Sequence, residues 1–389
     1  MRISKTAMRA MIPLATSAVL LSTAGVGSAA VPAGPAGERA SAHGTDRSVT
    51  AVTDQLAKQF AGALGARDVE RQVRESVNGG SGSTDLADLA DRTRGLEHFA
   101  RQVDRGNAAV LQARGLQDGA GSLIELRLGD DSMRDQVRKG EPLLVAGEAD
   151  EDADTITAYD SRGRVHRLDA RTVPGRVVLV VGIDGEKSLQ AGLAQLRETL
   201  AQHGVNADVP AAAPGKADRG AGMRASGGYD ATMMESARLK DDMEPWHKGG
   251  AEIYALVAGV NPNGQPQVDT VEMPYLDHDG ETYNPHQILV NWSHFKFNAA
   301  DVVMMEEDDT ANYAELARTV AKALLVVIQQ GQYVPLVEAV INAIPQGWFS
   351  DDHDYVDSWY TVQRHTAGQV RGAAGNGTLN LAPFYVGEL

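Results

Sequence analysis

The chain has 389 residues, no cysteine and a formal net charge of −16. Without cysteine it forms no disulfide and lacks the cysteine that a lipid-anchored precursor needs at its cleavage site. The excess of acidic side chains argues against nucleic acids and anionic membranes as partners, because both are negatively charged themselves. The length predicts about two domains.

Residues 1–30 have the pattern of a secretory signal. A basic segment with Arg2 and Arg9 precedes an apolar stretch over 10–26, which ends before the small residues Ser28-Ala29-Ala30. That stretch is short and interrupted by Ser, Thr and Gly, so a cleaved signal fits it better than the alternative, a membrane anchor. We therefore expect a secreted, extracellular protein.

The N-terminal region is expected to be helical at first and mixed α/β afterwards. Residues 31–47 are rich in Pro, Gly and Ala and are expected to be disordered. Within the domain predicted over 48–205, apolar residues four apart indicate helices before about residue 116. The later part alternates strand and helix patterns, with strands over 123–128, 142–146, 155–159, 164–168 and 176–182 and a helix over 188–203.

Residues 206–232 are rich in Pro, Gly and Ala and predict a linker. The remaining 233–389 predict a β domain, with short strands between turn residues. One exception is a helical pattern over 310–345, which predicts a helical hairpin inserted in this domain. We therefore expect an α+β chain, in which a helical and α/β region precedes an antiparallel β-sandwich.

Acidic clusters flank the helical insert on both sides, and a third precedes the first β-domain strand. Many carboxylates close together repel one another unless a cation compensates them. Calcium takes six to eight oxygen ligands in irregular geometry, so loops converging at one end of a sandwich suit it. Three separate solvated loops are the open alternative. The candidate ligands are Asp241, Asp242, Glu306, Asp308, Asp309, Asp351, Asp352, Asp354 and Asp357.

Other motifs give little support to an enzyme. No His-Glu-x-x-His, nucleophile elbow, phosphate loop or dinucleotide fingerprint occurs. Asp277-His278-Asp279-Gly280 lacks the spacing of an EF-hand loop and predicts a turn. Two alternatives to a binding module stay open. One is a secreted hydrolase that uses a carboxylate pair or a metal-bound water, and the other is a precursor whose N-terminal region is a pro-segment.

Four stretches of the C-terminal half resemble a secreted bacterial family known only as domain of unknown function 3103. They are 249–254, 304–309, 350–357 and 375–383. The resemblance extends over about residues 50–389 and implies no activity, because the family has none assigned. The acidic loops separately resemble those of C2 sandwiches, although a helical insert and the lack of a basic groove depart from that pattern.

The sequence thus predicts a calcium-binding extracellular module with a C2-like sandwich. Its ligand is an unknown extracellular molecule. Neither nucleic acid nor a membrane is expected as a partner, and no catalytic residue is assigned.

Overall fold

The computed structural model describes seven ranges of the chain: 42–79, 82–150, 153–209, 228–242, 244–307, 312–329 and 355–387. The predicted signal over 1–30 lies outside them. Residues Gly37–Leu389 form one compact unit. The α-helices are α1 (Ala42–Ala63), α2 (Arg67–Asn78), α3 (Leu86–Arg92), α4 (Glu97–Ala113), α5 (Arg134–Arg138), α6 (Gly185–Gln202) and α7 (Tyr313–Gln329).

The strands form three sheets. The first has six strands in the order β1-β2-β6-β3-β4-β5, the second has five in the order β13-β12-β9-β10-β7, and the third has four in the order β11-β8-β15-β14. The bounds are β1 (Ser83–Asp85), β2 (Ile124–Leu128), β3 (Leu144–Gly147), β4 (Thr155–Tyr159), β5 (Val165–Asp169), β6 (Val178–Ile183), β7 (Asn206–Asp208), β8 (Tyr229–Leu239), β9 (Ile253–Val260), β10 (Pro266–Glu272), β11 (Gln287–Asn291), β12 (Ala299–Glu306), β13 (Tyr355–Gln363), β14 (Gly368–Arg371) and β15 (Gly377–Val386).

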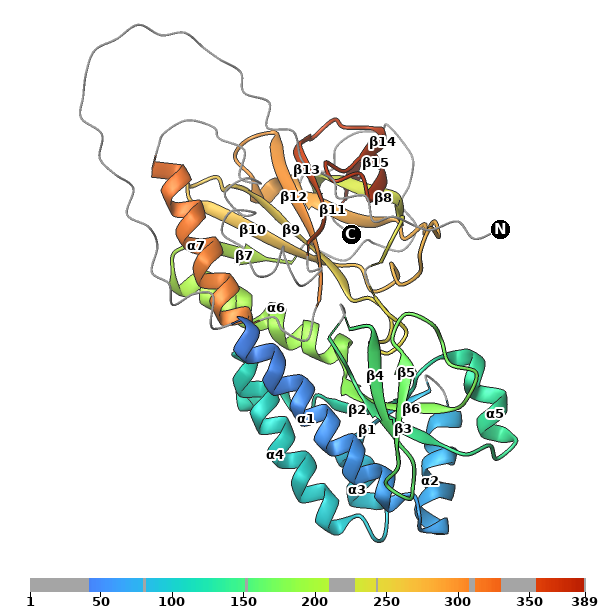
Figure 1. Cartoon of the computed structure of the whole chain (residues 1–389). Coiled ribbons are helices and arrows are strands. Elements are labelled where there is room, and N and C mark those ends of the chain that lie inside the picture. The colour runs from blue at the N-terminus through green and yellow to red at the C-terminus, as the bar shows by residue number, and fades with distance from the viewer. Residues whose placement is uncertain are drawn as a thin grey trace, which may run out of the picture. The chain divides into compact units, whose positions relative to one another are not determined.

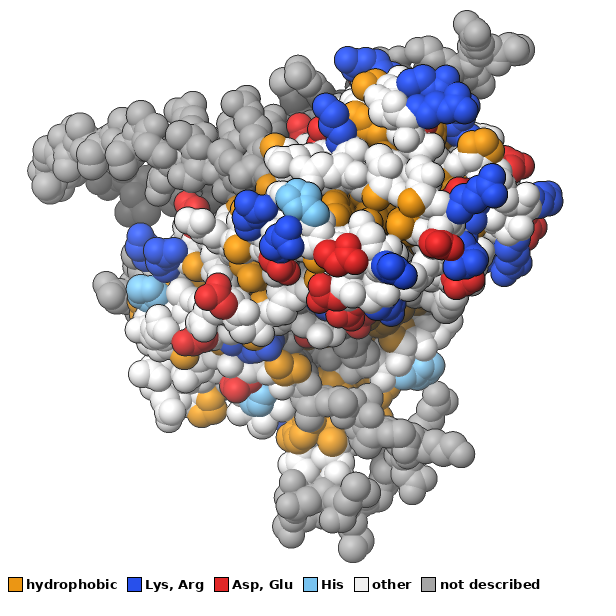
Figure 2. Space-filling model, turned by 90° about the horizontal axis from the view of Figure 1, so that it is seen from below, with side chains coloured by type: hydrophobic (Ala, Val, Ile, Leu, Met, Phe, Trp, Pro, Cys, Tyr) orange, Lys and Arg blue, Asp and Glu red, His pale blue; other side chains and the backbone are white. Residues whose placement is uncertain are grey.

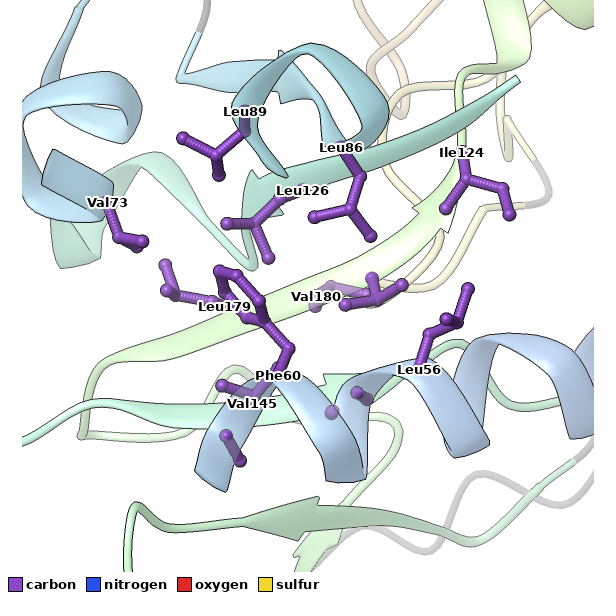
Figure 3. Packing of buried hydrophobic residues seen from close by; sticks show 14 of the residues in the cluster. Leu56, Phe60, Val73, Leu86, Leu89, Ile124, Leu126, Val145, Leu179 and Val180 are labelled. Carbon is purple, nitrogen blue, oxygen red and sulfur yellow. The ribbon is translucent and has the colours of Figure 1, made fainter. Parts of the chain in front are cut away.

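The six-stranded sheet packs against the N-terminal helices. Leu56 and Phe60 of α1 lie four residues apart on one helix face and point at the sheet, where they meet Val145 and Val180 (Figure 3). The predicted hairpin over 155–168 is confirmed as β4 and β5. Its turn is held by Asp160, whose carboxylate accepts hydrogen bonds from the backbone N–H groups of Arg162 and Arg164.

The five-stranded and four-stranded sheets share one buried cluster and therefore pack face to face as a sandwich. Strand β9 contributes Ile253, Ala255 and Val257 to this cluster. Its intervening residues, among them Tyr254 and Leu256, pack instead in a cluster with residues of α6 and α7. Figure 1 shows these two helices beside the five-stranded sheet. The five-stranded sheet is therefore covered on both faces, which explains the continuous apolar runs of its central strands.

Two elements lie inside the predicted linker over 206–232. Strand β7 pairs in parallel with β10, and β8 begins at Tyr229. The structure describes one helix, α7, of the predicted insert over 310–345, and the second helix lies outside the described residues. Helix α1 begins at Ala42, within the stretch expected to be disordered.

Charge is unevenly distributed over the surface drawn in Figure 2. Lys and Arg side chains are most numerous in the upper and right-hand parts of that view, and Asp and Glu side chains are interspersed with them and spread over the rest of the face. Hydrophobic side chains are scattered among the polar ones. In the part of the chain that is described, no helix combines the length and the apolar character needed to cross a bilayer.

Candidate metal centre

Three carboxylates meet at the end of β8. Asp241 and Asp242 follow this strand, and Asp279 comes from the turn between β10 and β11. One ligand oxygen from each residue lies within 4.8 Å of the other two. Asp241 and Asp279 are exposed and Asp242 is half-buried, so solvent and ions reach the cluster. We name these three residues the rim cluster.

Backbone hydrogen bonds fix the two loops that carry the rim cluster. Asp242 N–H donates to Asp279 Oδ1 at 2.8 Å, and Gly280 N–H donates to Leu239 O at 2.9 Å. On the other side, Asn376 Oδ1 accepts from Asp241 N–H at 3.1 Å, and its Nδ2 donates to Asp241 O at 2.9 Å. The predicted turn at Asp279-Gly280 is confirmed, since Gly280 has a positive φ of 71°.

The electrostatics of the rim cluster favour a cation. Burial raises the pKa of Asp242, a hydrogen bond from Glu244 N–H opposes this, and the charges of Asp279 and Asp241 raise the pKa further. A carboxylate beside two others gains by neutralisation, and a divalent ion supplies it without protonation. All the side-chain donors are oxygen atoms, which is the donor set that calcium and magnesium prefer.

Asp357 supports a neighbouring turn and faces away from solvent. Its side chain is fully buried. Its Oδ1 accepts from the N–H groups of Ser358 and Ala374, both at 2.8 Å, and its Oδ2 accepts from Gly377 N–H at 2.6 Å. The same turn carries Asn376, so Asp357 positions the rim cluster indirectly. Its oxygens accept from these N–H donors, and it is not among the three carboxylates that approach one another in the rim cluster.

Glu306 ends β12, Glu307 follows it, and both are buried. Glu307 forms an ion pair with Arg114 of the α4 C-terminus, and it accepts a hydrogen bond from Tyr313 Oη at 3.0 Å. Burial raises the pKa of Tyr313 well above its ordinary value, and the Glu307 charge adds to this. Asn312 caps α7 through Glu315 N–H at 3.1 Å. These groups tie the N-terminal helices to the sandwich.

Of the nine predicted ligands, the structure therefore brings Asp241 and Asp242 together and buries Glu306 and Asp357 elsewhere. The other five lie outside the described residues, so convergence of all nine on one ion stays a prediction. They are Asp308, Asp309, Asp351, Asp352 and Asp354.

A second group of ligand types lies on the five-stranded sheet. Asp208 of β7, Asp269 of β10 and His294, which ends the short helix Trp292–His294, each offer one ligand atom within 4.8 Å of the others. Sequence reasoning missed this group, which we name the strand cluster. His294 Nδ1 lies 2.8 Å from Asp269 Oδ2, and this hydrogen bond raises the pKa of His294. Burial raises the pKa of Asp269, and the bond from His294 opposes that rise.

Residues 53–388 match a family described as "Protein of unknown function (DUF3103)". The chain belongs to the DUF3103 family. The match includes both clusters and nearly all of the described elements, and it indicates no activity. No curated protein and no solved structure matches this DUF3103 chain. The function of this chain therefore has to be inferred from its own sequence and structure.

Proposed function

We propose that this DUF3103 protein is a secreted, calcium-binding extracellular module, and that Asp241, Asp242 and Asp279 hold the ion. The single observation that carries the proposal is the approach of these three carboxylates to within 4.8 Å, from two loops locked by backbone hydrogen bonds. Calcium completes its coordination with water and carbonyl oxygens, which an exposed rim supplies.

Calcium fits the rim cluster better than magnesium does. Magnesium prefers one or two carboxylates in near-ideal octahedral geometry and keeps most of its water, whereas calcium accepts several carboxylates in irregular arrangements. The position of the acids, at the end of a sandwich strand and in an adjacent turn, is also the feature that resembles a C2 sandwich.

In this proposal the ion fixes the loops beside the outer face of the four-stranded sheet for binding an extracellular ligand. The signal pattern of residues 1–30 supports secretion, where free calcium is abundant. The pairing of β7 with β10 and the Arg114–Glu307 ion pair favour an N-terminal region that stays associated with the sandwich over a pro-segment that is shed.

The test is thermal unfolding with calcium and with a chelator. An ion that binds only the folded protein at 100 times its dissociation constant stabilises it by about 2.7 kcal/mol. The double variant Asp241→Asn/Asp279→Asn removes two charges and is expected to lose this calcium-dependent shift. Asp104→Asn, at an exposed position of α4, removes a charge far from the rim along the chain and is expected to keep the full shift.

The proposal fails if the melting temperature of the parent protein is the same in millimolar calcium and in chelator. It also fails if the double variant keeps the shift of the parent, because the calcium would then bind elsewhere.

A further inference from the structure

The strand cluster begins with a repulsive pair. Asp208 and Asp269 are direct partners in the register of β7 and β10. Residues directly opposite one another present their side chains on the same face of a sheet, and like charges at such positions are destabilising. The Asp269 side chain is also fully buried, where an uncompensated charge costs most. A cation bound beside the pair would relieve this repulsion.

The Gln267 amide bridges the two carboxylates and holds them side by side. Gln267 Nε2 donates to Asp208 Oδ2 at 3.0 Å and to Asp269 Oδ1 at 2.6 Å. His294 completes the group with Nδ1 beside Asp269 Oδ2. Two carboxylates and one imidazole from three separate elements thus converge, each within reach of a single ion.

A further layer of hydrogen bonds holds the imidazole in place. Asn291 Oδ1 accepts from Ser293 N–H at 3.0 Å and from Ser293 Oγ–H at 2.7 Å, which turns its Nδ2 toward His294 Nε2 at 3.1 Å. Because this amide N–H donates to Nε2, the proton of the neutral ring lies on Nδ1, where it is shared with Asp269. The ring of His294 is therefore fixed from both nitrogens.

We propose that Asp208, Asp269 and His294 form a second metal site, which binds a divalent transition metal such as zinc. Imidazole nitrogen together with carboxylate oxygen is a donor set for zinc, whereas calcium takes oxygen ligands. Three protein ligands leave one position of a tetrahedral ion for water. The ion neutralises the Asp208–Asp269 pair. Binding at Nδ1 releases the proton shared with Asp269, and the ring takes a proton at Nε2 as the Asn291 amide turns away from it.

Calorimetric titration of the full chain with zinc chloride tests this site. Asp208 is exposed, so Asp208→Asn keeps the buried Asp269–His294 pair and is the primary variant. We expect the parent protein to bind one zinc ion, and we expect Asp208→Asn to weaken binding by about 10-fold or more. His294→Gln removes the nitrogen ligand and is expected to abolish the binding.

Asp279→Asn is the matched control, since it removes one rim carboxylate and leaves the strand cluster unchanged. It is expected to bind zinc as the parent does, and Asp208→Asn is expected to keep its calcium response. The zinc site and the calcium site are therefore tested independently of each other. No zinc binding by the parent, or equal zinc affinity in Asp208→Asn, overturns the strand-cluster site. Loss of zinc binding in Asp279→Asn overturns it too, by assigning the zinc to the rim.

Discussion

The exposed carboxylates of the rim cluster and the buried carboxylates of the sandwich differ in what compensates them. Glu307 has the Arg114 guanidinium, and Asp357 has three backbone N–H groups. Asp241 and Asp279 are exposed, and Asp279 Oδ1 accepts a hydrogen bond from Asp242 N–H, which orients the two loops. Fixed compensation makes a carboxylate part of the fold, whereas a solvent-facing cluster leaves room for an ion.

The largest expected effect comes from removing the compensation of Glu307. Arg114 is fully buried and forms an ion pair with Glu307. Arg114→Met removes this positive charge, while Tyr313 Oη still donates a hydrogen bond to the buried Glu307 carboxylate. Breaking a buried pair in this way costs about 3–5 kcal/mol. Urea denaturation measures the loss.

The double variant Arg114→Met/Glu307→Gln removes both charges and is expected to recover a large part of that loss. If the single and double variants are equally unstable, packing of the Arg114 stem rather than charge compensation explains the effect.

The next effect concerns the pH dependence of stability. Burial raises the pKa of Glu125 from 4.5 to about 7, Arg127 lowers it, and Asp184 raises it. The folded state therefore holds this proton more tightly than the unfolded chain. The corresponding stability is complete below pH 4.5 and is lost as the pH rises to about 7. A shift of this size corresponds to about 3 kcal/mol.

Glu125→Gln is expected to remove this loss, so the stability of the variant relative to the parent rises between pH 4.5 and 7. Denaturant unfolding across this pH range measures the difference. Glu75→Gln, at an exposed position of α2, controls for the loss of one charge. A difference between Glu125→Gln and the parent that does not change with pH would contradict the assignment.

A smaller effect separates Asp357 from the rim cluster. Asp357→Asn places an amide donor against a backbone N–H donor and loses charge-assisted hydrogen bonds, at a cost of about 2 kcal/mol. Because Asp357 is not one of the three rim carboxylates, calcium is expected to stabilise the Asp357→Asn variant as it stabilises the parent protein. Melting in calcium and in chelator checks this. If calcium no longer stabilises the variant, the turn held by Asp357 is required for calcium binding, and the separation of Asp357 from the rim cluster is wrong.

Much of the fold could be predicted from the sequence, because local patterns specify it. The Asp160 turn indicates the β4–β5 hairpin, and the 3.6-residue period of Tyr313, Leu316 and Val320 indicates α7. Strand β8 was missed because Asp230, Glu235 and Ser236 interrupt its apolar residues, and neighbouring strands decide its burial.

The candidate sites depend on register, which local patterns do not encode. Asp241 and Asp242 could be recognised as an acidic loop, but their partner Asp279 was assigned to a turn and nothing more. The strand cluster requires the parallel pairing of Asp208 with Asp269, across more than fifty residues of chain. No short sequence motif predicts a contact between residues so far apart in the chain. An acidic residue at the end of a short strand, such as Asp208, is the one local signal that could have indicated it.

The most direct test of the account is the calcium stoichiometry of the purified full chain, measured by calorimetric titration beside Asp241→Asn/Asp279→Asn. The rim cluster predicts one calcium ion per chain in the parent protein and none at that site in the variant. Equal stoichiometry and affinity in the two proteins, or no calcium bound by the parent, would contradict it.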